Sequence, residues 1–319
     1  MANEETNKQV LVTGGSGFVA IFCILELLQK EYRVRTTLRN MNRQNEVIDM
    51  LKTGGITSFE NLSFVQTDLT KDENDMIRPA VDGTLRVLKA ARDAGVKRVV
   101  MTSNFGAVGY SHTDKTKIIT EEEWTDPNEK GLSPYNKSKV LAEKAAWDFI
   151  KREGGALELT VINPVGIFGP SLGPDLSSGF ELLKRLLNGT MKRVPNITLT
   201  IVDVRDVADL HIRAMTAPAA KGQRFLAIAG DTVSLPDIAQ LLKSKLGAAA
   251  DKVSTKKLPD WVVRMIAPFN RVSRNIAPML NRYRDASNQK ARDMLGWNPR
   301  SNEEAILASA NSLLKYNLK

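Results

Sequence analysis

The chain has 319 residues, of which 42% are hydrophobic and 25% charged, and its formal net charge is +9. This length and composition exclude a chain that is too short or too polar to bury a core. A single cysteine excludes an internal disulfide, and two histidines without clustered cysteines or carboxylates argue against a metal site. The polar N-terminus and the lack of an apolar run of about 18 residues predict a soluble, cytoplasmic protein without a membrane partner.

Three local features have simple structural interpretations. The basic stretch 264–292 alternates arginines with apolar residues, so we interpret it as a solvated face and expect no nucleic-acid partner. The positive charge instead favours attraction of an anionic cofactor. Cys23 lies on an apolar segment and is expected to be buried and inert, while His211 is expected on a helix surface.

Strand-like and helix-like segments alternate, which predicts a parallel sheet covered on both faces. In chain order, strands are expected at 9–12, 33–38, 62–66, 98–102 and 158–162, and helices at 18–30, 43–52, 75–94 and 134–151. Later segments are a helix at 179–187, a strand at 199–202, a helix at 207–215, a strand at 225–229, and helices at 235–246 and 303–314. The predicted fold class is α/β: a doubly wound Rossmann-type parallel sheet with a smaller C-terminal substrate lobe.

The change to loops rich in Gly and Pro after Pro164 suggests where the lobes divide. We predict that residues 1–165 form a dinucleotide-binding domain, to which 198–217 return. Residues 166–197 and 218–319 are predicted to form the smaller substrate-binding lobe.

The first predicted strand runs into a glycine-rich turn, Val-Thr-Gly-Gly-Ser-Gly-Phe-Val, before an apolar helix. Backbone without side chains can approach a pyrophosphate, and the start of a helix stabilises negative charge. Because the turn follows the first strand of a doubly wound chain, we favour cofactor binding over a purely structural turn. The predicted phosphate-binding residues are Gly14, Gly15, Ser16, Gly17, Phe18 and Val19.

The end of the second predicted strand indicates which dinucleotide is bound. An NAD site usually places a carboxylate here to bind the ribose, whereas this chain has Arg39, with Arg43 nearby. A guanidinium attracts the extra phosphate of NADP, so we predict NADP(H) as the cofactor, without a metal. Asp68 and Leu69 follow the third strand, where an adenine ring would be held, although Asp68 also fits a simple turn.

Tyr135 and Lys139 form a Tyr-x-x-x-Lys pair just after Pro134, at the start of a predicted helix. Residues at this spacing lie on one helix face. A nearby ammonium and a cationic nicotinamide favour the phenolate, so Tyr135 could exchange a proton as hydride moves.

With these motifs in place, the chain resembles an extended short-chain dehydrogenase/reductase, close to the dihydroflavonol-4-reductase-like aldehyde and ketone reductases. Further matches are Val-Arg-Thr-Thr-Leu-Arg, Ser-Pro-Tyr-Asn-Lys-Ser-Lys, Asn-Pro-Val-Gly-Ile-Phe-Gly-Pro, Val-Asp-Val-Arg-Asp-Val-Ala and Leu-Gly-Trp-Asn-Pro-Arg. The resemblance implies NADPH-dependent reduction of a small carbonyl substrate by a monomer or homodimer. It implies Tyr135 as general acid, Lys139 on the nicotinamide ribose, Pro164 and Val165 beside the nicotinamide, and 204–207 as a structural return to the sheet.

The strand before the active site departs from the family pattern at one residue. Family members carry a serine that binds the substrate carbonyl, and this chain has Asn104 in its place, within Thr102-Ser103-Asn104. An amide can also donate to a carbonyl oxygen, so we predict Asn104 as a third catalytic residue. Ser103 could substitute only if the strand end shifted, because neighbouring strand residues point to opposite faces.

The second departure is a missing segment. The resemblance implies a short helix and a fourth strand after the third strand, and relative to that pattern about two dozen residues are lacking after Asp68. If the 98–102 strand filled the vacant position, Asn104 would move by about 4.8 Å, one strand spacing. If the position stays empty, the central sheet loses a ladder of backbone hydrogen bonds. Full family activity is therefore a hypothesis.

Two alternatives to a carbonyl reductase stay open. One is a catalytically impaired dinucleotide-binding protein of the same fold, which Asn104 and the shortened segment favour. The other is a nucleotide-sugar epimerase or dehydratase, which the Arg39 end of the second strand disfavours.

Overall fold

The computed structural model describes residues 8–68, 76–112, 117–174, 178–280 and 285–318. The strands that form two three-stranded parallel sheets are β1 (Gln9–Val12), β2 (Arg33–Leu38), β3 (Leu62–Gln66), β4 (Arg98–Thr102), β5 (Glu158–Pro164) and β10 (Arg224–Ala227). The helices around them are α1 (Phe18–Gln29), α2 (Gln44–Thr53), α3 (Ile77–Asp93), α4 (Pro134–Glu153) and α6 (Val204–Thr216). These elements agree with the predicted α/β fold.

The remaining part of the chain contains short two-stranded pairings and further helices. The strands are β6 (Gly166–Phe168), β7 (Val194–Pro195), β8 (Thr198–Leu199), β9 (Ile201–Asp203), β11 (Val233–Ser234) and β12 (Lys257–Leu258). The helices are α5 (Ser178–Leu187), α7 (Leu235–Lys245), α8 (Asp260–Ile266), α9 (Arg271–Ile276), α10 (Gln289–Leu295) and α11 (Asn302–Lys315). Strand β9 pairs in parallel with β6 and lies outside both three-stranded sheets.

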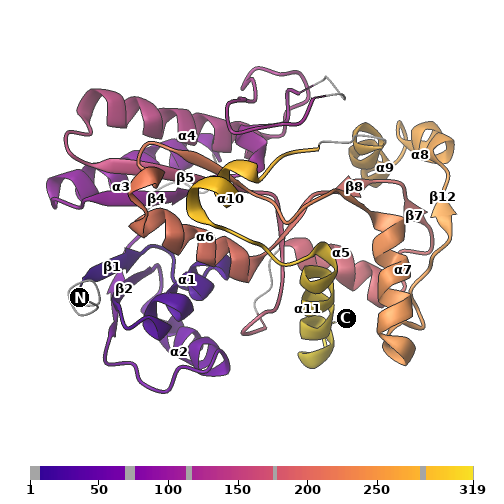
Figure 1. The fold of residues 1–319 in the computed structure, drawn as a ribbon. Coiled ribbons are helices and arrows are strands. Elements are labelled where there is room, and N and C mark those ends of the chain that lie inside the picture. Colours follow the sequence, from indigo (N-terminus) through magenta and orange to yellow (C-terminus); the bar gives the residue numbers. More distant parts are fainter. Residues whose placement is uncertain (1–7, 69–75, 113–116, 175–177, 281–284, 319) are drawn as a thin grey trace.

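The parallel strands fall into two separate sheets. One has the order β1-β2-β3 and the other β10-β5-β4, so β1 and β4 are each paired on one side among the described residues. The 98–102 strand therefore does not take over the vacant position, and of the two predicted outcomes the structure has the empty one. Figure 1 shows β1 and β2 at the lower left of the molecule, below β4 and β5.

One face of the first sheet carries apolar side chains in solvent. Leu11, in the middle of β1, is 57% exposed, and Val65 of β3 is 39% exposed. The opposite face of this sheet is packed, since Val10 and Val12 contact the buried residues of α1. The first sheet is thus covered on its α1 side and bare at the centre of its other face.

Helix α6 joins the two sheets. Val204, Ala208 and Ile212 lie one turn apart and belong to the core around α1, β2 and α2. Three other buried residues of α6, at 207, 210 and 214, belong to the core that contains β5 and β10. With both faces packed in this way, α6 lies between the sheets in Figure 1.

His211 is also buried on this helix, so the prediction of a surface position is wrong. Its Nδ1–H donates to the Val207 carbonyl at 2.7 Å, and Nε2 lies 2.7 Å from Thr102 Oγ1 at the end of β4. Burial lowers the pKa of His211. Cys23 is buried as predicted, and burial raises the pKa of its thiol to about 12.

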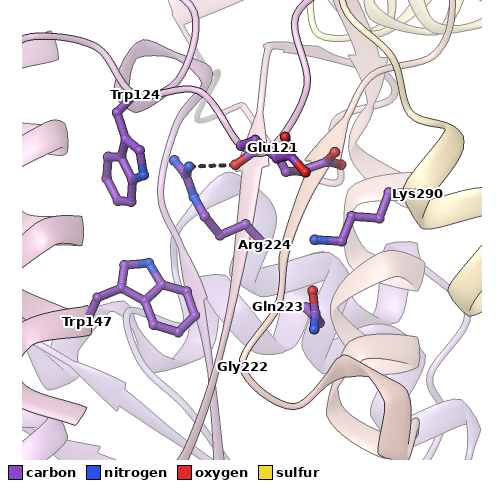
Figure 2. Close-up of a pocket in the computed structure, with 8 residues that line it drawn as sticks. Glu121, Trp124, Trp147, Gly222, Gln223, Arg224 and Lys290 are labelled. Atoms are coloured by element: carbon purple, nitrogen blue, oxygen red, sulfur yellow. Dashed lines mark hydrogen bonds between the residues drawn. The ribbon is translucent and has the colours of Figure 1, made fainter. Parts of the chain in front are cut away.

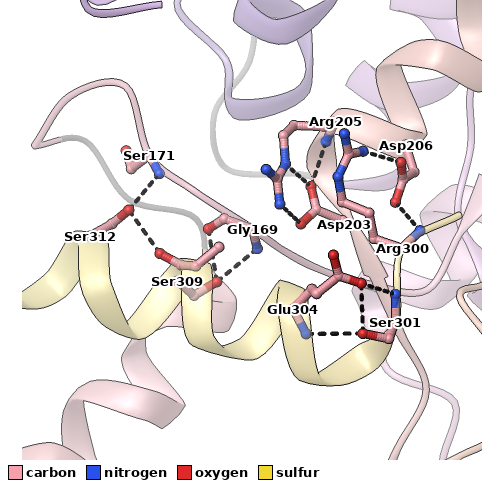
Figure 3. A network of polar contacts seen from close by, with 11 residues as sticks. Gly169, Ser171, Asp203, Arg205, Asp206, Arg300, Ser301, Glu304, Ser309 and Ser312 are labelled. Atoms are coloured by element: carbon pink, nitrogen blue, oxygen red, sulfur yellow. Dashed lines mark hydrogen bonds and ion pairs between the residues drawn. The ribbon is translucent and has the colours of Figure 1, made fainter. Parts of the chain in front are cut away.

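A polar network ties the C-terminal segment to the start of α6 (Figure 3). Asp206 accepts from the Arg300 amide at 2.7 Å and pairs with the Arg300 guanidinium, and the Trp297 indole donates to the Asp206 carbonyl at 2.9 Å. Ser309 and Ser312 of α11 accept from the backbone amides of the 169–171 loop. The two sequence motifs around Asp206 and Trp297 thus have a structural role here.

Candidate active site

The glycine-rich turn between β1 and α1 is the predicted phosphate cradle. Gly14 has a φ of +69°, which favours glycine, and its amide donates to Thr37 Oγ1 at 2.9 Å. A Cβ on Gly15 would lie 2.1 Å from Thr36 Oγ1, so no side chain fits there. Helix α1 then begins after Gly17 without a side-chain cap, leaving its first amides for an anion. These observations fit a dinucleotide pyrophosphate.

Two arginines follow the end of β2, and one of them contacts this turn. Arg39 is exposed, and its carbonyl accepts from Gln66 of β3. Arg43 donates to Ser16 Oγ at 3.1 Å and binds Glu46 through two nitrogens at 2.7 and 2.8 Å. This pairing holds the pKa of Glu46 below its usual range. The sequence suggests only a supporting role in phosphate binding for Arg43. The structure holds its guanidinium against Ser16 of the turn.

The third strand ends at Gln66, and the Thr67 amide still donates to the Leu38 carbonyl at 3.0 Å. Asp68 follows as an exposed residue beyond the same end of the sheet as Arg39. Leu69 lies outside the described residues. An adenine site beside Asp68 remains a prediction.

Helix α4 begins at a well-defined point. Ser133 Oγ accepts from the Asn136 amide at 3.2 Å, and Pro134 occupies the first turn. Tyr135 therefore stands in the first turn, where its side chain is 48% exposed. The Lys139 ammonium lies 5.7 Å from the centre of the Tyr135 ring, so the pair is brought together as predicted.

The electrostatics of this pair differ from the sequence-based interpretation. Desolvation by burial, followed by the influence of Tyr110, raises the pKa of Tyr135 above its usual value, and burial lowers the pKa of Lys139. The expected stabilisation of the phenolate by the ammonium does not dominate in this structure, because desolvation penalises both charged forms. Tyr135 is thus a protonated phenol at neutral pH, the form needed to donate a proton.

Asn104 follows β4 and caps a short 3-10 turn, Phe105–Ala107. Its Oδ1 accepts from the Gly106 amide at 2.7 Å, which fixes the orientation of the side-chain amide. A Cβ on Gly106 would lie 2.4 Å from Oδ1 of Asn136, so this turn packs tightly on the start of α4. The packing brings the Asn104 turn and the first turn of α4 together.

Ser103 points away from this surface. It is buried, and its hydroxyl donates to Glu143 Oε2 at 2.5 Å. It does not replace the missing family serine, because its hydroxyl is already engaged inside the sheet. Glu143 is a residue that the sequence analysis missed, although its position four residues after Lys139 on the same helix face was a usable signal.

Pro164 ends β5 and Val165 follows it, and both residues are buried. They stand at the carboxyl edge of the β4-β5-β10 sheet, as do Asn104 and the Ser103 end of β4. The predicted residues thus fall into two groups. The phosphate cradle and Arg39 belong to the β1-β2-β3 sheet, and the other group belongs to the β4-β5-β10 sheet.

Removal of both arginines near the cradle tests their role. We expect Arg39→Ala with Arg43→Ala to raise the Kd for NADPH by about tenfold or more, because charge-assisted bonds to the extra phosphate are lost. The Kd for NADH should change less than about twofold. Fluorescence titration measures both values, and Arg33→Ala, at the other end of β2, is the matched control. Equal losses for both cofactors would contradict this assignment.

Within the described residues, no three side chains of His, Cys, Asp or Glu gather in a way that could hold a metal ion. The helices of the same part of the chain include none that is long and apolar enough to cross a membrane.

The comparisons with known proteins agree with the fold and the motifs. Cinnamoyl-CoA reductase 1 from Arabidopsis thaliana is 34% identical over 245 residues, covering 69% of this chain and 70% of that protein. A putative NADPH-dependent methylglyoxal reductase from Candida albicans, GRP2, is 33% identical and covers 75% of this chain and 83% of its own length. The crystal structure of yeast methylglyoxal/isovaleraldehyde reductase Gre2 with NADPH matches with a TM-score of 0.79 at 23% identity, covering 97% of this chain and 99% of that one.

The NAD dependent epimerase/dehydratase family matches residues 10–229, more than half of the chain. The protein therefore belongs to the NAD dependent epimerase/dehydratase family of extended short-chain dehydrogenases/reductases, as its motifs predict.

Proposed function

We propose that this protein is an NADPH-dependent oxidoreductase that reduces the carbonyl group of a small aldehyde or ketone, with Tyr135 as proton donor. The packing of the Asn104 turn on the start of α4 carries this proposal, because it places this turn next to the helical turn that contains Tyr135. Relatives named as reductases support the reaction class.

The phosphate cradle would hold the pyrophosphate, and Arg39 with Arg43 would hold the additional phosphate. When bound, the reduced nicotinamide supplies hydride to the carbonyl carbon. Pro164 and Val165 would border the ring, and the Lys139 ammonium would bind the ribose hydroxyls. These positions follow the family resemblance and the donor chemistry of each residue.

Two side chains would donate hydrogen bonds to the oxygen of the substrate carbonyl. Oδ1 of Asn104 is taken by the Gly106 amide, so the side-chain N–H groups are the ones that can donate to a carbonyl oxygen. Tyr135 donates its phenolic proton as charge develops on that oxygen, and its raised pKa keeps the proton in place until then. The neighbouring Lys139 cation stabilises the phenolate that is left.

The divided sheet supports a second candidate. A protein that binds the dinucleotide without turnover would need only the β1-β2-β3 sheet, whereas turnover needs both sheets at a fixed separation. Hydride and proton transfer require contacts of about 3 to 3.5 Å, so a shift between the sheets would stop the reaction before it stopped binding.

The test compares binding with turnover. We expect NADPH to bind more tightly than NADH in a fluorescence titration, and absorbance of the reduced cofactor to fall when aldehydes or ketones are added. Binding of NADPH without any substrate-dependent loss of absorbance would reject the reductase in favour of the second candidate. Failure to bind either cofactor would reject both.

A further inference from the structure

Helix α4 carries a third polar residue in line with the catalytic pair. Tyr135, Lys139 and Glu143 follow one another at intervals of four residues and so lie along one side of the helix. Eight residues correspond to about 12 Å along the helix axis, so Glu143 is too far away to touch the reacting atoms. Its side chain is nevertheless fully buried.

The Glu143 carboxylate receives donors from all three strands of the second sheet. Ser103, at the end of β4, donates to Oε2 at 2.5 Å, and Asn163 of β5 donates to the same oxygen at 2.7 Å. Arg224 of β10 donates through Nε to Oε1 at 2.6 Å. One side chain therefore fixes the position of α4 relative to three strands.

The residues that bind Glu143 are also connected to the Asn104 turn. Ser103 precedes Asn104 directly, and the Nδ2 group of Asn163 makes a second hydrogen bond to the Asn104 carbonyl at 3.2 Å. Glu143 is therefore linked to the backbone that presents Asn104 and, through α4, to the turn that presents Tyr135 and Lys139.

Arg224 is itself fixed from the other side (Figure 2). Its Nη1 donates to the carbonyls of Glu121 and Glu123 at 2.8 and 3.0 Å, and its guanidinium lies 3.8 Å from the centre of the Trp124 ring. A buried carboxylate is tolerated when it is paired and fully hydrogen-bonded, and these contacts give Glu143 one defined place.

We infer that Glu143 is a positioning residue that sets the separation between Asn104 and Tyr135. The inference rests on the proposed reductase function, in which both side chains act on one carbonyl oxygen. An error of about 1 Å in such an arrangement can lower the rate on the order of a hundredfold. The affinity for the cofactor phosphates, which would bind on the other sheet, would not change.

The test weakens this link without removing the buried ion pair. In Ser103→Ala, Glu143 keeps Arg224 and Asn163, so the fold is retained. The matched control is Thr160→Val, because Thr160 is a fully buried hydroxyl in the same sheet whose bond, 2.7 Å to the Ala220 carbonyl, does not involve α4. We expect Ser103→Ala to lower kcat about tenfold or more, with KM and the Kd for NADPH within about twofold. Thr160→Val should lower stability but leave kcat unchanged.

Hydrogen–deuterium exchange gives a readout that does not depend on turnover. Ser103→Ala is expected to speed exchange in the first turn of α4 and at residues 104–107, and Thr160→Val is not. If the wild-type chain consumes no NADPH, the proposed reaction fails and this exchange comparison decides the role of Glu143. Identical exchange in both variants, or equal effects of both on kcat, would overturn the inference.

The charged pair provides a second variant. Glu143→Gln alone leaves the Arg224 cation buried without its partner and is expected to unfold the chain in part. Glu143→Gln combined with Arg224→Gln removes both charges, and we expect it to regain stability without regaining kcat. Recovery of both in the double variant would show that the pair serves stability alone.

Discussion

An extended apolar strand inserted after Lys71 is expected to raise the free energy of unfolding by on the order of 5 kcal/mol and turnover by about tenfold or more. Lys71 lies outside the described residues, between the first sheet and α3. The added strand would pair with the edges of β1 and β4 that have no partner strand among the described residues. Backbone bonds on both sides and buried apolar side chains together exceed the entropy cost of ordering the insert.

The control is an insert of the same length made of glycine and serine. It lengthens the connection equally but cannot form a buried strand, so it should leave stability unchanged or slightly lower. Urea denaturation and NADPH oxidation measure the two effects. If both inserts behave alike, the open position is not what limits this protein.

Substitution of the proposed proton donor has the second large expected effect. Tyr135→Phe should lower kcat by about two to three orders of magnitude, because a positioned general acid contributes on that scale. The Kd for NADPH should change by less than about twofold, since the phosphate cradle lies on the other sheet. Stability should change little, because the Tyr135 side chain is half exposed.

Tyr316→Phe is the control for this loss. Tyr316 caps the last helix, and its hydroxyl makes only a long contact of 3.5 Å to the Ser171 carbonyl. Steady-state rates at saturating NADPH compare the two variants. A Tyr135→Phe protein that keeps most of the wild-type kcat would show that another group supplies the proton.

The sequence was sufficient for features that depend on local patterns. The glycines after β1 predict the turn that precedes α1, and Ser133 with Pro134 predicts the start of α4. The missing strand could also be inferred, because a family resemblance shows what a continuous sheet requires. The roles of the site residues and the division into two lobes stay predictions.

Features that depend on packing between distant segments could not be predicted in this way. His211 has a polar side chain on a helix, and only the placement of α6 between two sheets explains its burial. The partners of Glu143 are 40, 20 and 81 residues away in the chain, at Ser103, Asn163 and Arg224. The pKa of Tyr135 depends on how far the fold removes the side chain from solvent. The Tyr-x-x-x-Lys spacing gives no information about this burial.

The packing of α6 against both sheets has a consequence for how the molecule comes apart. Without a shared strand, the β1-β2-β3 unit and the β4-β5-β10 unit are expected to open with different free energies, as separate cooperative units. A dinucleotide whose phosphates rest on one unit and whose nicotinamide rests on the other would then act as a crosslink. At a hundred times its Kd, such a ligand adds about 2.7 kcal/mol to the stability of the joined state. The concentration of cofactor would thus decide whether this chain melts in one transition or in two.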